Sequence, residues 1–189
     1  MIMTITSFVL ACSNEGSGSH EGSHHDSAQA KSASKDTTKK SVPSEIKKQI
    51  GNTEVQINYH APAVRGRTIW GGLVPYDEVW VTGAHQATTL EVGKDFQVGN
   101  KQVPAGKYAI FTIPGKEEWT VIINKNWNQH LADDYSQNED VVRIKVKPLV
   151  TQEVTERLKY EIVEIGERTA NIIISWEKLQ VPFSIEIRQ

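Results

Sequence analysis

The chain has 189 residues, enough for one domain of ordinary size, since domains typically hold about 100–150 residues. Its 21 basic and 23 acidic side chains give a formal net charge of -2. Nucleic-acid binding needs clustered Lys and Arg that release counterions, so this balance argues against a nucleic-acid partner.

The N-terminus carries a signal-like segment, residues 1–11, which is uncharged, largely apolar and directly followed by Cys12. Cys12 is the single cysteine, which excludes an internal disulfide. The run is too short to span a membrane, which takes about 20 residues, but it fits the core of a secretory signal, about 7–15 residues. Val9–Cys12 resembles a bacterial lipobox, which implies cleavage before Cys12 and a lipid on its thiol. Because no Lys or Arg precedes the run, the alternative is an apolar tail with an incidental cysteine.

Residues 12–50 are predicted to form a flexible polar tether. From Ser13 to Ser41 there is no Ile, Leu, Val, Met, Phe, Trp or Tyr, so the segment cannot bury enough apolar surface to offset the entropy of ordering. A transition metal could bind at His20–Asp26, although a solvated patch is favoured there. Signal, cysteine and tether together predict a bacterial lipoprotein of the cell envelope, held on a membrane by its N-terminal lipid and facing the periplasm or the outer surface.

Residues 51–189 are predicted to form one all-β domain. Val55, Ile57 and Tyr59 alternate with polar residues, as in a half-buried strand. Similar patterns bounded by turn residues predict strands at Thr68–Trp70, Val79–Thr82, Thr88–Val92, Phe96–Val98, Lys101–Val103, Lys107–Ile113, Glu118–Asn124, Val141–Val146, Leu158–Ile165, Asn171–Trp176 and Phe183–Ile187.

Two short segments interrupt this pattern. Gly99-Asn100 predicts a two-residue hairpin turn, because both residue types accept positive φ. Asn126–Glu139 is a polar insertion, with one helical turn expected around Gln129–Ala132. Elsewhere no amphipathic helix of ten or more residues is expected. About ten short strands without helical crossovers predict a single antiparallel β-sandwich or barrel.

Several sequence blocks recur in the order typical of one protein family. The chain resembles the domain of unknown function 2911 family in the blocks Tyr59–Arg67, Trp70–Tyr76, Val79–Ala84, Val103–Tyr108, Phe111–Gly115 and Trp119–Ile122. The resemblance runs from about Val55 to the C-terminus. It implies an exported bacterial protein, of a family common in Bacteroidetes, with a β-rich domain, and it implies no particular reaction.

The chain departs from the family's pattern after Trp80. The family block there usually reads Arg-Thr-Gly-Ala-Asn-Glu-Ala-Thr, whereas this chain has Val81, His85 and Gln86 in place of the Arg, Asn and Glu. A polar site shared by the family at this block would therefore lack an arginine and a carboxylate here.

The segment from Arg65 to Thr88 is the richest in residues that bind ligands. Turns on a β scaffold commonly carry binding groups, and Trp with Arg suits a sugar ring or an anionic group. The candidate partner is therefore a small molecule or a glycan, and the candidate ligand-binding residues are Arg67, Tyr76, Trp80, Thr82, His85 and Gln86. The alternative is structural, with buried tryptophans and an arginine that ties backbone carbonyls.

No catalytic residues, metal ligands or cofactor are predicted. Neither Gly-x-Ser-x-Gly nor His-Glu-x-x-His occurs in the sequence. A binding or envelope-associated module is therefore the leading interpretation, ahead of an enzyme. The alternative is a hydrolase or metal-dependent enzyme with a site around Arg67, Thr82 and His85, which would require these three side chains to share one cavity.

Trp80 lies between Val79 and Val81 in a predicted strand, so its ring should take the face opposite to both valines. Burial of so large a ring is favourable, which predicts a mostly buried Trp80. Arg67 is expected close by, with its guanidinium held by backbone carbonyls or a carboxylate.

Overall fold

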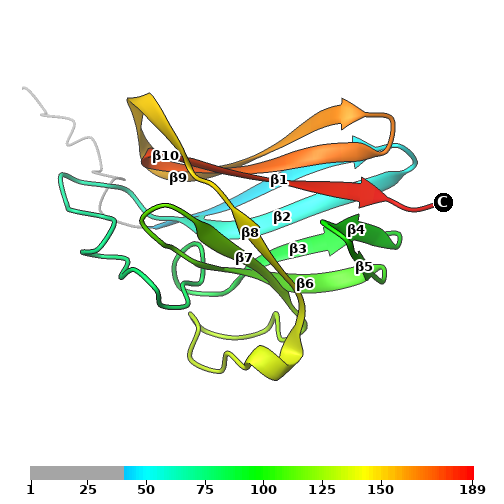
Figure 1. Cartoon of the computed structure of the whole chain (residues 1–189), viewed down its shortest axis with the longest axis horizontal. Coiled ribbons are helices and arrows are strands. Elements are labelled where there is room, and N and C mark those ends of the chain that lie inside the picture. The colour runs from blue at the N-terminus through cyan, green and yellow to red at the C-terminus, as the bar shows by residue number, and fades with distance from the viewer. Residues whose placement is uncertain (1–40) are drawn as a thin grey trace, which may run out of the picture. The chain divides into compact units, whose positions relative to one another are not determined.

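The computed structural model describes residues 41–189, which form ten strands in two antiparallel sheets (Figure 1). The strands are β1 Val42–Ile50, β2 Thr53–Ala61, β3 Thr88–Val92, β4 Phe96–Val98, β5 Lys101–Val103, β6 Gly106–Ile113, β7 Trp119–Asn124, β8 Asp140–Val146, β9 Leu149–Gly166 and β10 Thr169–Ile187. One sheet has the order β1-β2-β3-β6-β7-β8 and the other β5-β4-β10-β9. This arrangement confirms the all-β class and selects the sandwich.

The core lies between the two sheets because each strand alternates apolar and polar residues. On β2, Val55 and Ile57 are fully buried, while Glu54 and Gln56 face the other side. One buried cluster joins residues of both sheets, such as Leu90 of β3 and Ile172 of β10. The sandwich is therefore held together by apolar burial across its middle.

The domain begins earlier than the sequence predicts. Nine residues of the expected tether form β1, which pairs along its length with β2. The predicted boundary at residue 51 is therefore wrong. As an edge strand, β1 needs few apolar residues, and Pro43, Lys47 and Lys48 are residue types typical of edges. Residues 1–11, Cys12 and the rest of the tether to residue 40 lie outside the described residues. Along residues 41–189, no helix has the length and apolar character to cross a membrane.

The two strands predicted at Thr68–Trp70 and Val79–Thr82 are not present. Residues 62–87, here called the β2–β3 connection, form turns with only isolated one-residue bridges, such as Trp80 to Thr112. Positive φ angles at residues other than glycine turn the chain repeatedly within this connection, at Arg65, Asp77, Thr82 and His85.

Other expectations about element length are also corrected. The predicted strands Asn171–Trp176 and Phe183–Ile187 are parts of β10, a single strand of 19 residues. Its partner β9 has 18 residues, so this hairpin is not built from short strands. The helical turn expected around Gln129–Ala132 is absent, and a 3-10 turn lies at Gln137–Glu139 instead.

Residues 125–139, here called the β7–β8 insertion, pack against the β2–β3 connection. The Ala87 N–H donates to the Gln129 carbonyl at 3.0 Å, and the Leu131 N–H donates to the His85 carbonyl at 2.6 Å. Beneath them, a second apolar cluster includes Phe111 and Ile122 on the face of the six-stranded sheet away from the main core. The insertion therefore covers one part of that outer face.

Candidate functional site

Four tryptophans gather where the β2–β3 connection meets the sandwich. The rings of Trp70, Trp80, Trp119 and Trp176 form five close pairs with centroids 4.9 to 6.4 Å apart. Trp119 and Trp176 are each only 1% exposed. Trp80 is half-buried and stacks on Trp176 at 5.6 Å with an interplanar angle of 19°. We call this group the tryptophan cluster.

Three of the four indole N–H groups have no hydrogen-bond partner among the described residues, namely those of Trp70, Trp119 and Trp176. Most of the ring pairs are edge to face, an arrangement in which an N–H can point at a neighbouring π face. Trp80 differs, because its Nε1 donates to the Gly83 carbonyl at 3.3 Å. This bond fixes the half-buried ring in place.

Arg67 is held as the sequence predicts. Its Nε donates to the Val64 carbonyl at 3.1 Å, and its Nη2 donates to the Ala63 carbonyl at 2.6 Å. Because Ala63 bridges to Arg157 of β9, the arginine is fixed on backbone that is itself fixed to the sandwich. These two bonds use the N–H of Nε and one N–H of Nη2, so the other N–H groups of the Arg67 guanidinium have no hydrogen-bond partner among the described residues.

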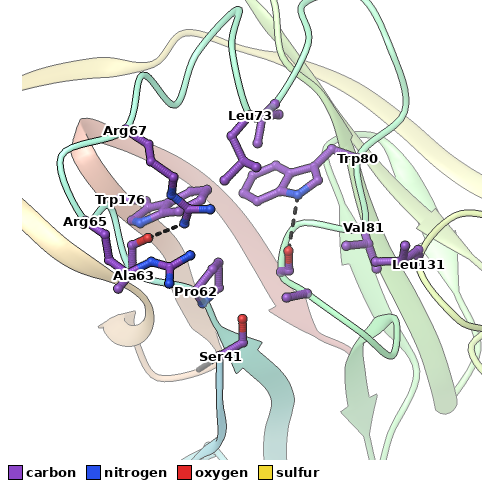
Figure 2. A pocket seen from close by; sticks show the side chains of 13 residues that line it. Ser41, Pro62, Ala63, Arg65, Arg67, Leu73, Trp80, Val81, Leu131 and Trp176 are labelled. Carbon is purple, nitrogen blue, oxygen red and sulfur yellow. Dashed lines mark hydrogen bonds between the residues drawn. The ribbon is translucent and has the colours of Figure 1, made fainter. Parts of the chain in front are cut away.

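Arg67 and Trp80 line the same cavity, of about 350 Å³, here called the Arg–Trp pocket. Figure 2 shows the two arginines of this pocket on one side, with Trp80 and apolar side chains across from them. The residues that define it are Arg65, Arg67, Leu73, Trp80, Leu131 and Trp176. Trp80 is half-buried rather than mostly buried because one edge of its ring forms part of this wall.

The charge in the pocket comes from its two arginines. Arg65 is exposed and has a positive φ of 51°, and its backbone N–H donates to Glu156 Oε1 at 2.9 Å. The remaining lining is mostly apolar, with Leu73 and Leu131 left 47% and 38% exposed. Such a pocket can receive an apolar group and an anion side by side.

Thr82 is a structural residue. It is fully buried with a φ of 54°, which is costly for a β-branched residue. Its carbonyl accepts hydrogen bonds from Thr88 Oγ1 at 3.0 Å and from the Tyr160 hydroxyl at 2.8 Å, and its own hydroxyl lies 3.0 Å from that of Thr112. These contacts hold the backbone in its strained conformation.

The other candidate residues lie apart from the Arg–Trp pocket. His85 is exposed, and its ring lies 5.2 Å from that of His60, where burial and the His85 charge lower the pKa of His60. Tyr76 packs against Gly71, where an added Cβ would come within 2.8 Å of the phenol ring. Gln86 lines a separate groove on the sheet.

Arg67, Thr82 and His85 therefore do not line one common cavity. Thr82 is enclosed in the fold, and His85 faces outward on a turn. Within residues 41–189 there is also no group of three or more His, Cys, Asp and Glu side chains that could hold a metal ion. The arrangement that the enzymatic alternative requires is not found in the described part of the chain.

Three residues of the Arg–Trp pocket were not expected from the sequence. Trp176 comes from β10, and its pattern within a strand indicates only burial. Leu131 belongs to the β7–β8 insertion, and its exposed side chain reaches the pocket because the Leu131 N–H is bonded to His85. Leu73 lies in a tight turn, and no pattern in the sequence indicates that its side chain lines a cavity.

The model of a protein family, described as "Protein of unknown function (DUF2911)", matches residues 41–185. The chain therefore belongs to this family, and the match begins beside the first residue of β1. Comparisons with curated proteins and with solved structures found no match.

Proposed function

We propose that this protein is an extracytoplasmic binding module whose Arg–Trp pocket takes a ligand with an apolar body and an anionic group. The observation that carries the proposal is the pairing of Arg65 and Arg67 on one side of a cavity whose other walls are mainly apolar (Figure 2). A ligand of this kind, such as an organic carboxylate, matches both parts of the lining.

Arg67 suits an anion because its side chain is already ordered. The bonds to the Ala63 and Val64 carbonyls hold the guanidinium, so little side-chain entropy is lost when a ligand binds. Charge-assisted hydrogen bonds from a guanidinium to a carboxylate are stronger than neutral ones. The anionic group would therefore be oriented by Arg67, with Arg65 adding positive charge.

The apolar part of the ligand would cover surface that is now open to water. Leu73 and Leu131 are large apolar side chains that remain exposed beside the half-buried Trp80. Burial of apolar surface contributes about 25 cal/mol per Å². Contact with these three residues would thus supply affinity, while the arginines select for charge.

The binding experiment uses two dyes of nearly the same shape. The probe 8-anilinonaphthalene-1-sulfonate has an apolar body and an anionic sulfonate, and N-phenyl-1-naphthylamine is its uncharged analogue. The full chain should bind the sulfonate more tightly, as measured by dye fluorescence. Arg65→Gln and Arg67→Gln should each weaken sulfonate binding by roughly tenfold or more, and decanoate should compete with it.

The matched control is Arg168→Gln, which removes an exposed arginine outside the pocket. It should leave sulfonate binding unchanged. Equal affinity for the two dyes, or sulfonate binding that survives both pocket substitutions, would contradict the proposal.

We further propose that Cys12 carries a lipid that anchors the protein in the bacterial cell envelope. The apolar run before Cys12 and the polar residues that follow it support this anchor. Since the sandwich begins at Val42, the tether between lipid and domain would span residues 13–41. Cells given a clickable palmitate analogue should label the wild type and not Cys12→Ala. Equal labelling of the wild type and Cys12→Ala would contradict a lipid on Cys12.

A further inference from the structure

A second cavity, of about 390 Å³, lies on the outer face of the six-stranded sheet. On β2 and β3, Asn58 and Thr89 are adjacent in sequence to the core residues Ile57 and Leu90, so they point away from the main core. We call this cavity the Trp127 groove and define it by the lining residues Asn58, Gln86, Thr89, Lys107, Trp127 and Asn128. None of these residues lines the Arg–Trp pocket.

Trp127 is the one tryptophan outside the tryptophan cluster, and it is 40% exposed. It belongs to the β7–β8 insertion, whose Ala132 and Tyr135 cover apolar sheet residues, whereas Trp127 is in neither apolar cluster. A large ring that is left partly exposed in a cavity, with no role in the core, is a feature of a contact surface.

The other groups that line the groove are mostly neutral hydrogen-bonding side chains. Asn58, Gln86 and Asn128 supply amides, each of which can both donate and accept. Thr89 is only 7% exposed, and its hydroxyl is buried without a hydrogen-bond partner among the described residues. A buried hydroxyl without a partner in the wall of a cavity indicates a ligand group that would complete it.

The charge of Lys107 is already balanced. Its Nζ lies 3.7 Å from Glu91 Oε2 and 4.7 Å from the centroid of the Trp127 ring. The ammonium therefore covers the indole while keeping an ion-pair partner beside it. A ligand ring can replace the ammonium over the indole while Lys107 remains paired with Glu91.

We propose that the Trp127 groove binds a neutral pyranose ring of a glycan. A pyranose has an apolar C–H face and a rim of hydroxyls, which match an indole face surrounded by amides and a threonine hydroxyl. An ion is disfavoured, because Lys107 is paired with Glu91, and the pKa of His60, which also lines the groove, is lowered by burial and by the charge of His85. This site is independent of the Arg–Trp pocket, so either proposal can fail without the other.

Isothermal titration of the full chain with a saccharide panel tests the proposal. The panel holds the methyl glycosides of glucose, galactose, mannose and N-acetylglucosamine, the trisaccharides maltotriose and chitotriose, and the methyl glycoside of glucuronic acid as the charged comparison. At least one neutral saccharide should bind with a Kd below about 1 mM, and Trp127→Ala should weaken it by roughly tenfold or more.

Three further variants separate binding from folding. Trp127→Phe should keep most of the affinity, because an aromatic face remains. Lys107→Ala should bind at least as well as the wild type, because the indole is uncovered. Thr89→Val keeps the side-chain shape and removes the unpartnered hydroxyl, so it should weaken saccharide binding while leaving the melting temperature unchanged or higher.

The proposal is overturned if no neutral saccharide binds, or if Trp127→Ala binds as well as the wild type. Binding of the glucuronide alone, lost in Lys107→Ala, would show an anion site instead. Saccharide binding that Arg67→Gln abolishes and Trp127→Ala does not would assign the sugar to the Arg–Trp pocket.

Discussion

The tryptophan cluster and the Trp127 groove use the same type of residue for different purposes. Trp119 and Trp176 are 1% exposed, pack ring against ring and belong to the main core, whereas Trp127 is 40% exposed and packs in neither apolar cluster. Trp80 lies between these extremes, with one part in the cluster and one part in the wall of the Arg–Trp pocket. Burial, rather than residue type, separates the tryptophans that stabilise the domain from those available to a ligand.

The two regions also differ in how their backbone is held. The floor of the groove lies on regular strands, whose ladder bonds fix Asn58 and Thr89, while Trp127 and Asn128 come from the β7–β8 insertion. The Arg–Trp pocket is built on the β2–β3 connection, where hydrogen bonds outside any strand ladder fix strained residues such as Thr82. Substitutions near the pocket should therefore affect folding as well as binding, while those in the groove should affect binding alone.

The largest expected effect is at the centre of the tryptophan cluster. Trp176→Ala should lower the free energy of unfolding by about 3–5 kcal/mol, because the surrounding rings cannot fill the cavity that it leaves. Trp80→Ala should cost less, since that ring is already half-exposed. Urea unfolding of the full chain measures both. If Trp176→Ala lowered the free energy of unfolding by less than Trp80→Ala, the division between core and contact rings would be wrong.

A smaller effect is expected where the sandwich clamps the connection. Tyr160→Phe removes the hydroxyl that donates to the Thr82 carbonyl at 2.8 Å inside the core. The carbonyl keeps its bond from Thr88, so the free energy of unfolding should fall by about 1 kcal/mol. Thr88→Val alone should cost a similar amount. The double variant should cost more than the sum, because the carbonyl then has no partner; simple additivity would argue against this clamp.

The β7–β8 insertion should loosen at alkaline pH. The pKa of Tyr135 is raised to about 12 by burial and by its hydrogen bond to Asp140. A tyrosine in an unfolded chain has a pKa of about 10. The contribution of the protonated Tyr135 hydroxyl to the free energy of unfolding is therefore fully present below about pH 10 and is lost as the pH rises through about 12. The wild type should lose more stability than Tyr135→Phe between about pH 9 and about pH 12, and equal losses would contradict the raised pKa of Tyr135.

The smallest effect on folding is expected in the groove. Trp127→Ala should change the free energy of unfolding by no more than about 0.5 kcal/mol, as is usual for surface substitutions. The same urea titrations as for Trp176→Ala measure it. A loss of about 2 kcal/mol or more would show that Trp127 is a packing residue, and the contrast between the two regions would disappear.

Much of the fold was predictable because period-two alternation is strong where one face is buried. β3 and the β4–β5 hairpin occur at the predicted residues. Period-two alternation does not predict β1, because an edge strand needs few apolar residues, and Lys47 and Lys48 are equally typical of a polar tether. The strands predicted within residues 62–87 are absent. Turns with positive φ bury the apolar residues of this segment, and such turns do not produce an alternating pattern in the sequence.

The candidate site was predictable only in part. The sequence predicts that backbone carbonyls or a carboxylate hold Arg67, and the structure shows the carbonyls. The partners that complete the pocket, Trp176 and Leu131, come from elements distant in the chain, so only tertiary packing brings them to Trp80. Thr82 and His85 are close to Trp80 in sequence, yet the turns place Thr82 in the interior and His85 on the surface.

The most direct test of the division between regions follows the indole N–H signals of the five tryptophans in a two-dimensional ¹H–¹⁵N spectrum of the full chain. Substitution of each tryptophan by Phe assigns the signals. Titration with 8-anilinonaphthalene-1-sulfonate should shift Trp80 and Trp176 and leave Trp127 in place, and a neutral saccharide that binds should shift Trp127 alone. Both ligands shifting the same indole, or the sulfonate shifting only Trp127, would contradict the account of two separate sites.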